Sequence, residues 1–126
     1  MARENHPVLF EQVGPVARIT LNRPDKYNSL NAGLAYGLQS ALDRCVEVPG
    51  LRAVYLTGAG KAFCAGQDLQ EVTGEDAPTF ETILGKHLNP IVQKIRALAL
   101  PVVCGVNGVA AGAGANIALA CDLTVA

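Results

Sequence analysis

The chain has few of the features that mark nucleic-acid-binding or membrane proteins. Its ten Lys and Arg residues face eleven Asp and Glu residues, a formal net charge of −1, and the basic residues form no run. A basic patch is the electrostatic footprint of nucleic-acid binding, so no nucleic-acid partner is predicted. There is no apolar run of membrane length and no basic-then-apolar leader. We therefore expect no membrane association and a cytoplasmic protein.

Histidine is sparse, and the four cysteines are widely separated along the chain. The two histidines, His6 and His87, stand outside any motif and are interpreted as surface or packing residues. The cysteine spacing fits neither a zinc site nor a C-x-x-C redox motif, which predicts no metal site and four reduced, mostly buried thiols. These are Cys45, Cys64, Cys104 and Cys121.

What the chain does contain is a regular alternation of strand and helix patterns. Half of its 126 residues are hydrophobic and 17% are charged, as expected of one globular domain. The order strand, strand, helix, strand, helix, strand, helix, strand predicts α/β architecture. Ser29 or Asn31 can cap the first helix, and Pro90 is expected to kink or restart the second. Strands are expected within 8–22, where Gly14-Pro15 would turn a hairpin, and at 51–58, 101–107 and from 123 on. Helices are expected over 34–45, over 80–98 and after the glycines at 112 and 114.

Two segments share one layout, a buried strand, then small residues, then a helix start. They are "YLTGAGKAFCAGQDL" and "VCGVNGVAAGAGANIALA". A helix start offers unpaired N–H groups and a partial positive charge. If both starts converge, two N–H groups can hold one oxygen atom, which is oxyanion-hole geometry. Tight packing of helix on sheet also favours Gly and Ala, and spacing alone leaves both interpretations open.

Two other glycine-rich sites are disfavoured by the same segments. A dinucleotide-binding turn needs G-x-G-x-x-G, and Ile117 stands where the third glycine or alanine belongs. A phosphate-binding loop needs an earlier glycine and a Ser or Thr after its lysine, and "GAGKAF" has neither around Lys61.

Three segments of the sequence carry a family resemblance. "GKAFCAGQDL" and "VNGVAAGAGANIALACDLTVA" resemble the two signature segments of the crotonase (enoyl-CoA hydratase/isomerase) superfamily, and "ITLNRPDKYNSLN" resembles its N-terminal segment. The resemblance spans essentially the whole chain. It implies a spiral of strand-strand-helix turns, with residues 1–126 forming the N-terminal half. The later active-site carboxylate and the helices that assemble a homotrimer or hexamer would lie outside the chain.

The resemblance also implies roles for individual residues. Family members bind an acyl-CoA thioester and hold its enolate oxygen between two backbone N–H groups, here those of Gln67 and Ala113. Gly112 and Gly114 would let the backbone approach the thioester. Coenzyme A would arrive as part of the substrate, with no other cofactor. The CoA pocket would be lined through backbone groups of Ser29, Ala65 and Leu69, with Lys26 as a phosphate contact or an ordinary surface lysine, whereas Asp68 is interpreted as a helix cap.

Asn116 departs from the family's hydratase pattern, which has a glutamate here. An amide cannot act as a general base, so Asn116 disfavours hydration and is expected to face the acyl pocket. "FCAGQDL", "NPIVQKI" and "GVAAGAGA" are similar to the subgroup that isomerises ring-1,2-epoxyphenylacetyl-CoA in phenylacetate degradation, which makes an acyl-CoA isomerase the leading hypothesis. A hydratase, dienoyl-CoA isomerase or thioesterase of the same fold is the alternative. A non-catalytic acyl-CoA-binding or assembly subunit is the alternative of another class.

Overall fold

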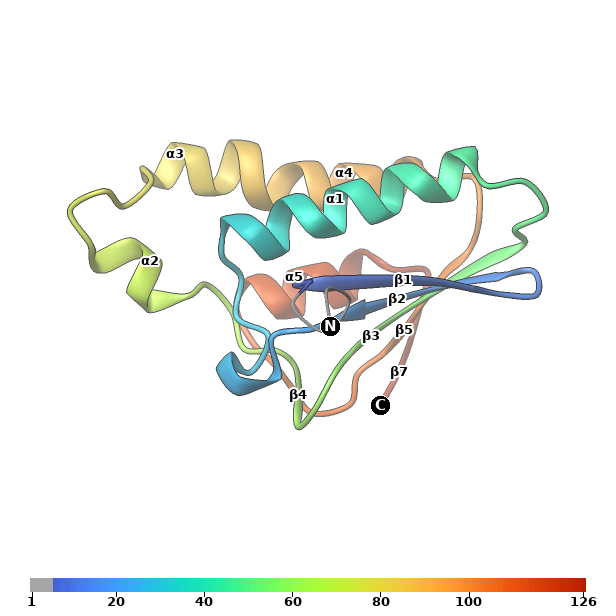
Figure 1. The fold of residues 1–126 in the computed structure, drawn as a ribbon, viewed down its shortest axis with the longest axis horizontal. Coiled ribbons are helices and arrows are strands. Elements are labelled where there is room, and N and C mark those ends of the chain that lie inside the picture. The colour runs from blue at the N-terminus through green and yellow to red at the C-terminus, as the bar shows by residue number, and fades with distance from the viewer. Residues whose placement is uncertain (1–5) are drawn as a thin grey trace.

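The computed structural model describes residues 6–126 and confirms the α/β architecture (Figure 1). Its strands are β1 (Val8–Val13), β2 (Val16–Leu21), β3 (Ala53–Gly58), β4 (Ala62–Cys64), β5 (Val102–Gly105), β6 (Val109–Ala110) and β7 (Leu123–Val125). Its helices are α1 (Ala32–Glu47), α2 (Leu69–Thr73), α3 (Phe80–Thr82), α4 (Asn89–Ala97) and α5 (Ala113–Ala120), with a 3₁₀ turn η2 (Pro24–Lys26) and a π-helical stretch η3 (Ile83–Leu88).

The main sheet has five strands in the order β1-β2-β3-β5-β7. β1 and β2 form the predicted antiparallel hairpin, in which Val13 pairs with Val16 and Gly14 takes a φ of +57°. A positive φ is natural for glycine, so Gly14 fits this tight turn. The other neighbours pair in parallel, and the parallel strands are joined through helices that cover one face of the sheet (Figure 1).

Helix α1 follows the sequence prediction closely. The Oδ1 atom of Asn31 accepts a hydrogen bond from the Leu34 N–H at 2.9 Å, so Asn31 and not Ser29 caps the helix. Its apolar stripe faces the sheet, because Leu34, Leu38 and Leu42 are fully or almost fully buried.

The second predicted helix is a composite. α3, η3 and α4 follow one another from Phe80 to Ala97 without a break, and Pro90 is the second residue of α4. Proline is tolerated at a helix start because its missing N–H is not needed there. Of the predicted kink or restart at Pro90, the structure shows only that the π-helical stretch passes into α-helix at Asn89, one residue before the proline. The π-helical first half was not predicted.

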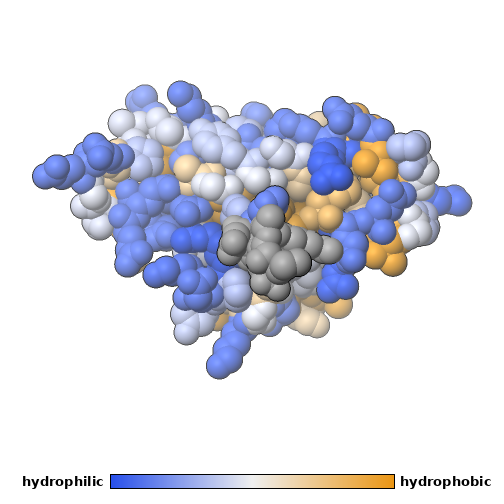
Figure 2. Space-filling view, viewed as in Figure 1, coloured by the Kyte–Doolittle hydropathy of each residue, from blue (hydrophilic) through white to orange (hydrophobic). Residues whose placement is uncertain are grey.

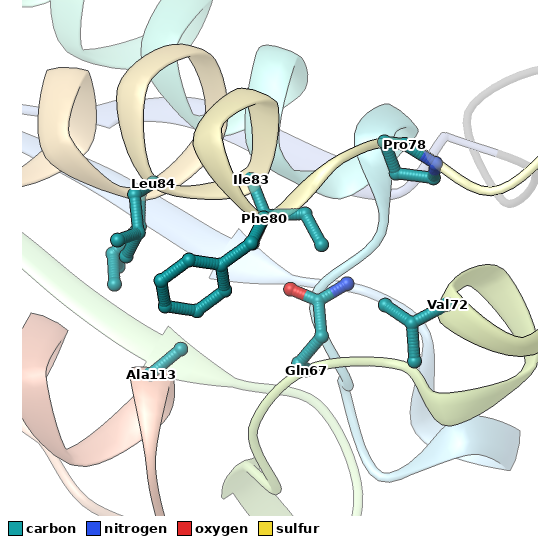
Figure 3. Close-up of a pocket in the computed structure, with 8 residues that line it drawn as sticks. Gln67, Val72, Pro78, Phe80, Ile83, Leu84 and Ala113 are labelled. Atoms are coloured by element: carbon teal, nitrogen blue, oxygen red, sulfur yellow. The ribbon is translucent and has the colours of Figure 1, made fainter.

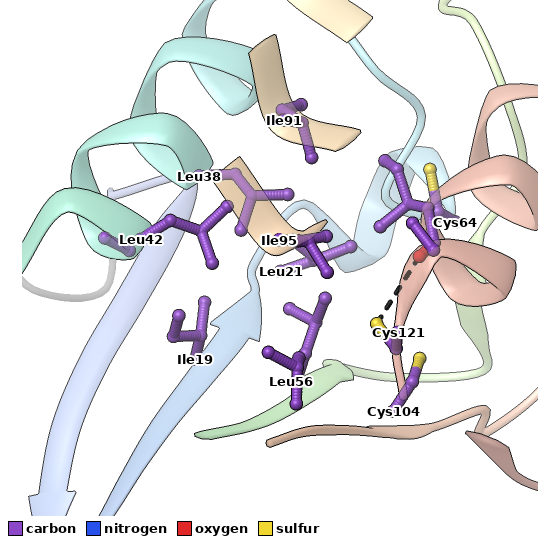
Figure 4. Packing of buried hydrophobic residues seen from close by; sticks show 14 of the residues in the cluster. Ile19, Leu21, Leu38, Leu42, Leu56, Cys64, Ile91, Ile95, Cys104 and Cys121 are labelled. Carbon is purple, nitrogen blue, oxygen red and sulfur yellow. Dashed lines mark hydrogen bonds between the residues drawn. The ribbon is translucent and has the colours of Figure 1, made fainter. Parts of the chain in front are cut away.

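The core lies between the sheet and the helices α1, α4 and α5 (Figure 4). All four cysteines are free and buried, as predicted. Burial raises the pKa of the Cys45 thiol to about 11, so this thiol is protonated at neutral pH. The largest fully buried side chains include Ile19, Leu21, Leu38, Leu42, Leu56, Phe63, Ile91 and Ile117.

The surface seen in Figure 2 is mainly hydrophilic, with apolar area gathered at the end of the molecule where α1 ends and the β1–β2 hairpin turns. Within residues 6–126, no helix has the length and apolar character needed to cross a membrane. The same residues contain no cluster of three or more His, Cys, Asp or Glu side chains arranged to hold a metal ion.

Candidate functional site

The two glycine-rich segments meet through a pair of short strands that the sequence did not reveal. β4 and β6 pair in parallel, with Ala62 opposite Val109 and Cys64 opposite Ala110. The Ala111 N–H also donates to the Cys64 carbonyl at 3.1 Å. Because parallel strands end at the same edge, the residues that follow them emerge side by side. Gln67 and Ala113 each lie three positions beyond the Cys64–Ala110 pair.

Gln67 and Ala113 line one cavity of about 480 Å³ (Figure 3). The remaining lining residues come from α2, the loop before α3, and the α3–η3 helix, and they are all apolar: Val72, Pro78, Phe80, Ile83, Leu84 and Leu88. None of the eight described lining side chains is titratable. The cavity is thus an apolar pocket with a few polar groups at one end, the usual form of a small-molecule site.

The backbone N–H of Gln67 points away from Leu30, the residue that forms a β-bridge with it. Leu30 bridges this position in parallel, donating to the Gly66 carbonyl at 2.7 Å and accepting from the Asp68 N–H at 2.9 Å. In a parallel bridge the intervening residue points its own N–H and C=O to the other side. Within residues 6–126, the Gln67 N–H donates no hydrogen bond, so it is free to bind a ligand.

The Ala113 N–H is the second free donor. Ala113 is the first residue of α5, and its N–H has no acceptor among residues 6–126. The first N–H groups of a helix have no intrahelical partner and carry the positive end of the helix dipole. Two free N–H donors, on two residues that line one apolar cavity, can stabilise a negatively charged oxygen if both face it.

The glycines around α5 are required for two different structural reasons, close packing and a positive φ. A Cβ atom on Gly114 would lie 2.1 Å from the Cys64 carbonyl oxygen, and one on Gly108 would lie 2.0 Å from that of Lys61. Both glycines therefore allow close packing against the β4 segment, which supports the packing interpretation for them, and the approach of Gly114 to a thioester stays a prediction. Gly112 is different. Its φ of +53° favours glycine, but a Cβ atom added there would have space, because the nearest atom is the Gly66 Cα at 4.0 Å.

The segment predicted to bind the CoA part lies beside the Gln67 loop. The Ala65 N–H donates to the Tyr27 carbonyl at 3.0 Å, which joins this loop to residues 26–30. Among the predicted contacts, Ser29 is half-buried. The exposed ones are Lys26, Ala65 and Leu69. The structure thus brings these residues together on an accessible surface, and their contact with CoA stays a prediction.

Asp68 caps α2, as predicted, and also forms an ion pair that was not predicted. Its Oδ1 atom accepts from the Gln70 N–H at 2.9 Å, and its Oδ2 atom accepts from the Arg23 guanidinium at 3.1 Å. Burial raises the pKa of the Asp68 carboxyl, but these hydrogen bonds and the Arg23 charge outweigh it and hold the pKa below its usual range.

Asn116 lies on α5 one turn after Ala113, and its own N–H donates to the Gly112 carbonyl at 3.1 Å. Its side chain is exposed and is not one of the cavity-lining groups. Its predicted contact with the acyl group therefore stays a prediction.

Sequence reasoning missed three polar residues that shape the site. Glu71 accepts hydrogen bonds from the Gln67 side chain and from the Ala32 N–H. Fully buried Asn28, with a φ of 55°, donates to the Ala62 carbonyl at 2.9 Å, and Asn107 donates to the same carbonyl at 3.2 Å. Asn tolerates the left-handed region, so its place in a polar loop was the available signal for Asn28.

Comparison with known proteins adds independent findings. The family model described as "Enoyl-CoA hydratase/isomerase" matches residues 11–126. A protein of Rhodobacter capsulatus named "Probable enoyl-CoA hydratase" is 45% identical over 121 residues, covering 96% of this chain and 46% of that protein. The 1,2-epoxyphenylacetyl-CoA isomerase of Escherichia coli is 43% identical over 115 residues, covering 88% of this chain and 44% of the isomerase.

A solved structure supports the same relationship. The crystal structure of an enoyl-CoA hydratase from Bacillus anthracis matches with a TM-score of 0.82 and 36% identity, covering 94% of this chain and 46% of that one. The chain thus spans about half the length of the curated relatives it matches.

Proposed function

The chain belongs to the enoyl-CoA hydratase/isomerase family, and from this premise we propose that it forms the acyl-CoA-binding half of an acyl-CoA isomerase. The observation that carries the proposal is the pair of free N–H groups, from Gln67 and Ala113, on one apolar cavity. The cavity takes the acyl group, and the N–H pair holds the thioester oxygen.

The proposed reaction passes through a thioester enolate. A base removes a proton from the carbon next to the thioester, and the electrons of that C–H bond move onto the thioester oxygen. The two N–H groups and the α5 dipole stabilise the negative charge that develops there. The enolate then rearranges or takes the proton back at another position. Since none of the described side chains that line the cavity is titratable, we place the base outside residues 1–126.

For the substrate we propose a ring-1,2-epoxide of phenylacetyl-CoA. The E. coli relative carries that activity in its name, and the cavity is apolar and bordered by Phe80. Coenzyme A would enter as part of the substrate, without a further cofactor, and the complete protein would be a homotrimer or hexamer. Hydration of an enoyl-CoA is the second candidate, favoured by the names of the hydratase relatives.

The experiment that separates the two candidates measures crotonyl-CoA hydration beside ring-epoxide isomerisation in the complete protein that carries this chain. We expect isomerisation to be the faster reaction, because Asn116 cannot exchange a proton at neutral pH. Asn116→Glu should add hydration activity, and Asn116→Ala should keep part of the isomerisation. Hydration by the wild type at the rate of a dedicated hydratase would move the function to the second candidate.

A further inference from the structure

The Gln67 side chain carries a buried polar atom that lacks a partner. Its amide oxygen, Oε1, is one of two such buried side-chain atoms among the described residues, and the other is His87 Nδ1. A buried acceptor without a hydrogen bond is costly, and native structures keep few of them. Gln67 is also the only polar side chain among the eight described groups that line the cavity.

Glu71 determines which way this amide faces. The Glu71 Oε1 atom accepts from Gln67 Nε2 at 3.2 Å, and its Oε2 atom accepts from the N–H of Ala32 at 2.8 Å. An ionised carboxylate can only accept hydrogen bonds, so the amide nitrogen of Gln67 must face Glu71. The carboxylate itself is stabilised at the positive N-terminus of the 16-residue helix α1.

The oxygen is thereby turned to the opposite side. In Figure 3 it points toward Phe80 and Ile83, which border the cavity, while the nitrogen points toward Val72. The result is a hydrogen-bond acceptor with a fixed orientation in an otherwise apolar pocket. Such an acceptor favours a ligand that brings a donor to it.

We infer that Gln67 Oε1 accepts a hydrogen bond from a hydroxyl group on the acyl part of an acyl-CoA, on the second or third carbon counted from the thioester carbonyl. The inference rests on the proposed function only in taking the ligand to be an acyl-CoA whose thioester oxygen meets the Gln67 N–H. Because the N–H and Oε1 belong to one residue, the hydroxyl must lie close to the thioester.

The test compares two ligands that differ by one hydroxyl. The dissociation constants of butyryl-CoA and of each enantiomer of 3-hydroxybutyryl-CoA are measured by calorimetry on the complete protein. We expect one hydroxylated enantiomer to bind the wild type about fivefold tighter than butyryl-CoA. Gln67→Met keeps the N–H and the chain length but has no strong acceptor. In this variant the ratio of the butyryl-CoA dissociation constant to that of the tighter-binding 3-hydroxybutyryl-CoA enantiomer should fall to about one. The matched control Gln70→Met, an exposed glutamine on α2, should leave the ratio unchanged.

Glu71→Gln provides a second, independent variant, because an uncharged partner lets the Gln67 amide turn over. Its ratio should lie between those of the wild type and Gln67→Met. An unchanged ratio in Gln67→Met, or equal binding of all three ligands by the wild type, would overturn the inference while the acyl-CoA function stands. Absence of binding by every acyl-CoA would overturn both.

Discussion

At the scale of residues, the candidate site depends on backbone groups more than on side chains. The N–H groups of Gln67 and Ala113 are free because of where they lie, one opposite the Leu30 bridge and the other at the first position of α5. The side chains around them hold these positions. Glu71 holds the Gln67 amide, and Asp68 joins the start of α2 to Arg23.

The first prediction at this scale concerns the Gln67 N–H. Gln67→Pro removes this donor and should lower kcat by roughly 10²–10³, the usual effect of losing one oxyanion-hole donor. The control is Gln67→Met, which changes the side chain and keeps the N–H. Steady-state kinetics of the complete protein measure the difference. Wild-type turnover in Gln67→Pro would contradict the oxyanion role.

The second prediction concerns the ion pair between Asp68 and Arg23, whose side chains are only 11% and 17% exposed. Asp68→Asn should lower the free energy of unfolding by about 2 kcal/mol at neutral pH. Because the folded pKa of Asp68 is lowered, this contribution is full above about pH 4 and is lost as the pH falls through the folded pKa. Urea unfolding of both proteins between pH 2 and 7 measures it.

Asp43→Asn is the matched control for this measurement. Asp43 pairs with Lys94 at 2.7 Å, but the two side chains are 58% and 34% exposed. An exposed pair contributes little, so the variant should change stability by less than about 1 kcal/mol. A pH dependence equal to that of Asp68→Asn would show that the Arg23 pair has no special effect.

At the scale of elements, the site is built by the short β4–β6 pair and by the helices on either side of it. β4 and β6 set the loops before α2 and α5 side by side, and the α3–η3 helix supplies most of the apolar cavity wall. Helix α5 can approach β4 closely only because Gly114 has no side chain. The position of the Ala113 N–H therefore depends on this contact between helix and strand.

This contact makes Gly114→Ala a sharp test. The added Cβ would meet the Cys64 carbonyl at 2.1 Å, a backbone atom that cannot move aside cheaply. We expect a loss of about 2–3 kcal/mol in unfolding free energy, typical of overpacking, with a lower kcat as α5 shifts. Gly85→Ala in η3 is the control, because nothing lies within 4 Å of its Cβ position. Thermal unfolding that ranks the two variants in the opposite order would contradict the packing role of Gly114.

At the scale of the whole molecule, a single layer of helices covers one face of a mostly parallel sheet (Figure 1). The cavity opens among α2, the α3–η3 helix and the start of α5, away from the β1–β2 hairpin. Residues of β7 and the end of α5 remain on the surface, with Leu119 78% and Leu123 63% exposed. The chain corresponds to about half of each curated relative.

We therefore predict that residues 1–126 by themselves show no isomerase activity, because none of the cavity-lining side chains in the described part of the chain can take up a proton. They should also unfold at a lower temperature than the complete protein, since the apolar residues of β7 stay exposed. Activity assays and calorimetry of the two proteins test this side by side. Isomerase activity in the fragment equal to that of the complete protein would place the base within residues 1–126.

The sequence by itself determined the order of elements, the apolar face of α1, the turn at Gly14 and the cap at Asp68. It also directed attention to Gln67 and Ala113. These features depend on periodicity, capping and turn chemistry within a few neighbouring residues, so they can be read locally. The strands β4 and β6, of three and two residues, were too short to show a period.

Only the tertiary structure decided what surrounds those residues. The sequence predicts a helix over 80–98 but does not indicate that its apolar residues between Phe80 and Leu88 form a cavity wall, and the contact of Glu71 with Gln67 and Ala32 has no local signal. The same holds for Gly114, whose need for a bare Cα comes from Cys64, fifty positions earlier. Each of these features joins segments far apart in the chain, and such pairings depend on how the sheet and helices pack together, which no local pattern encodes.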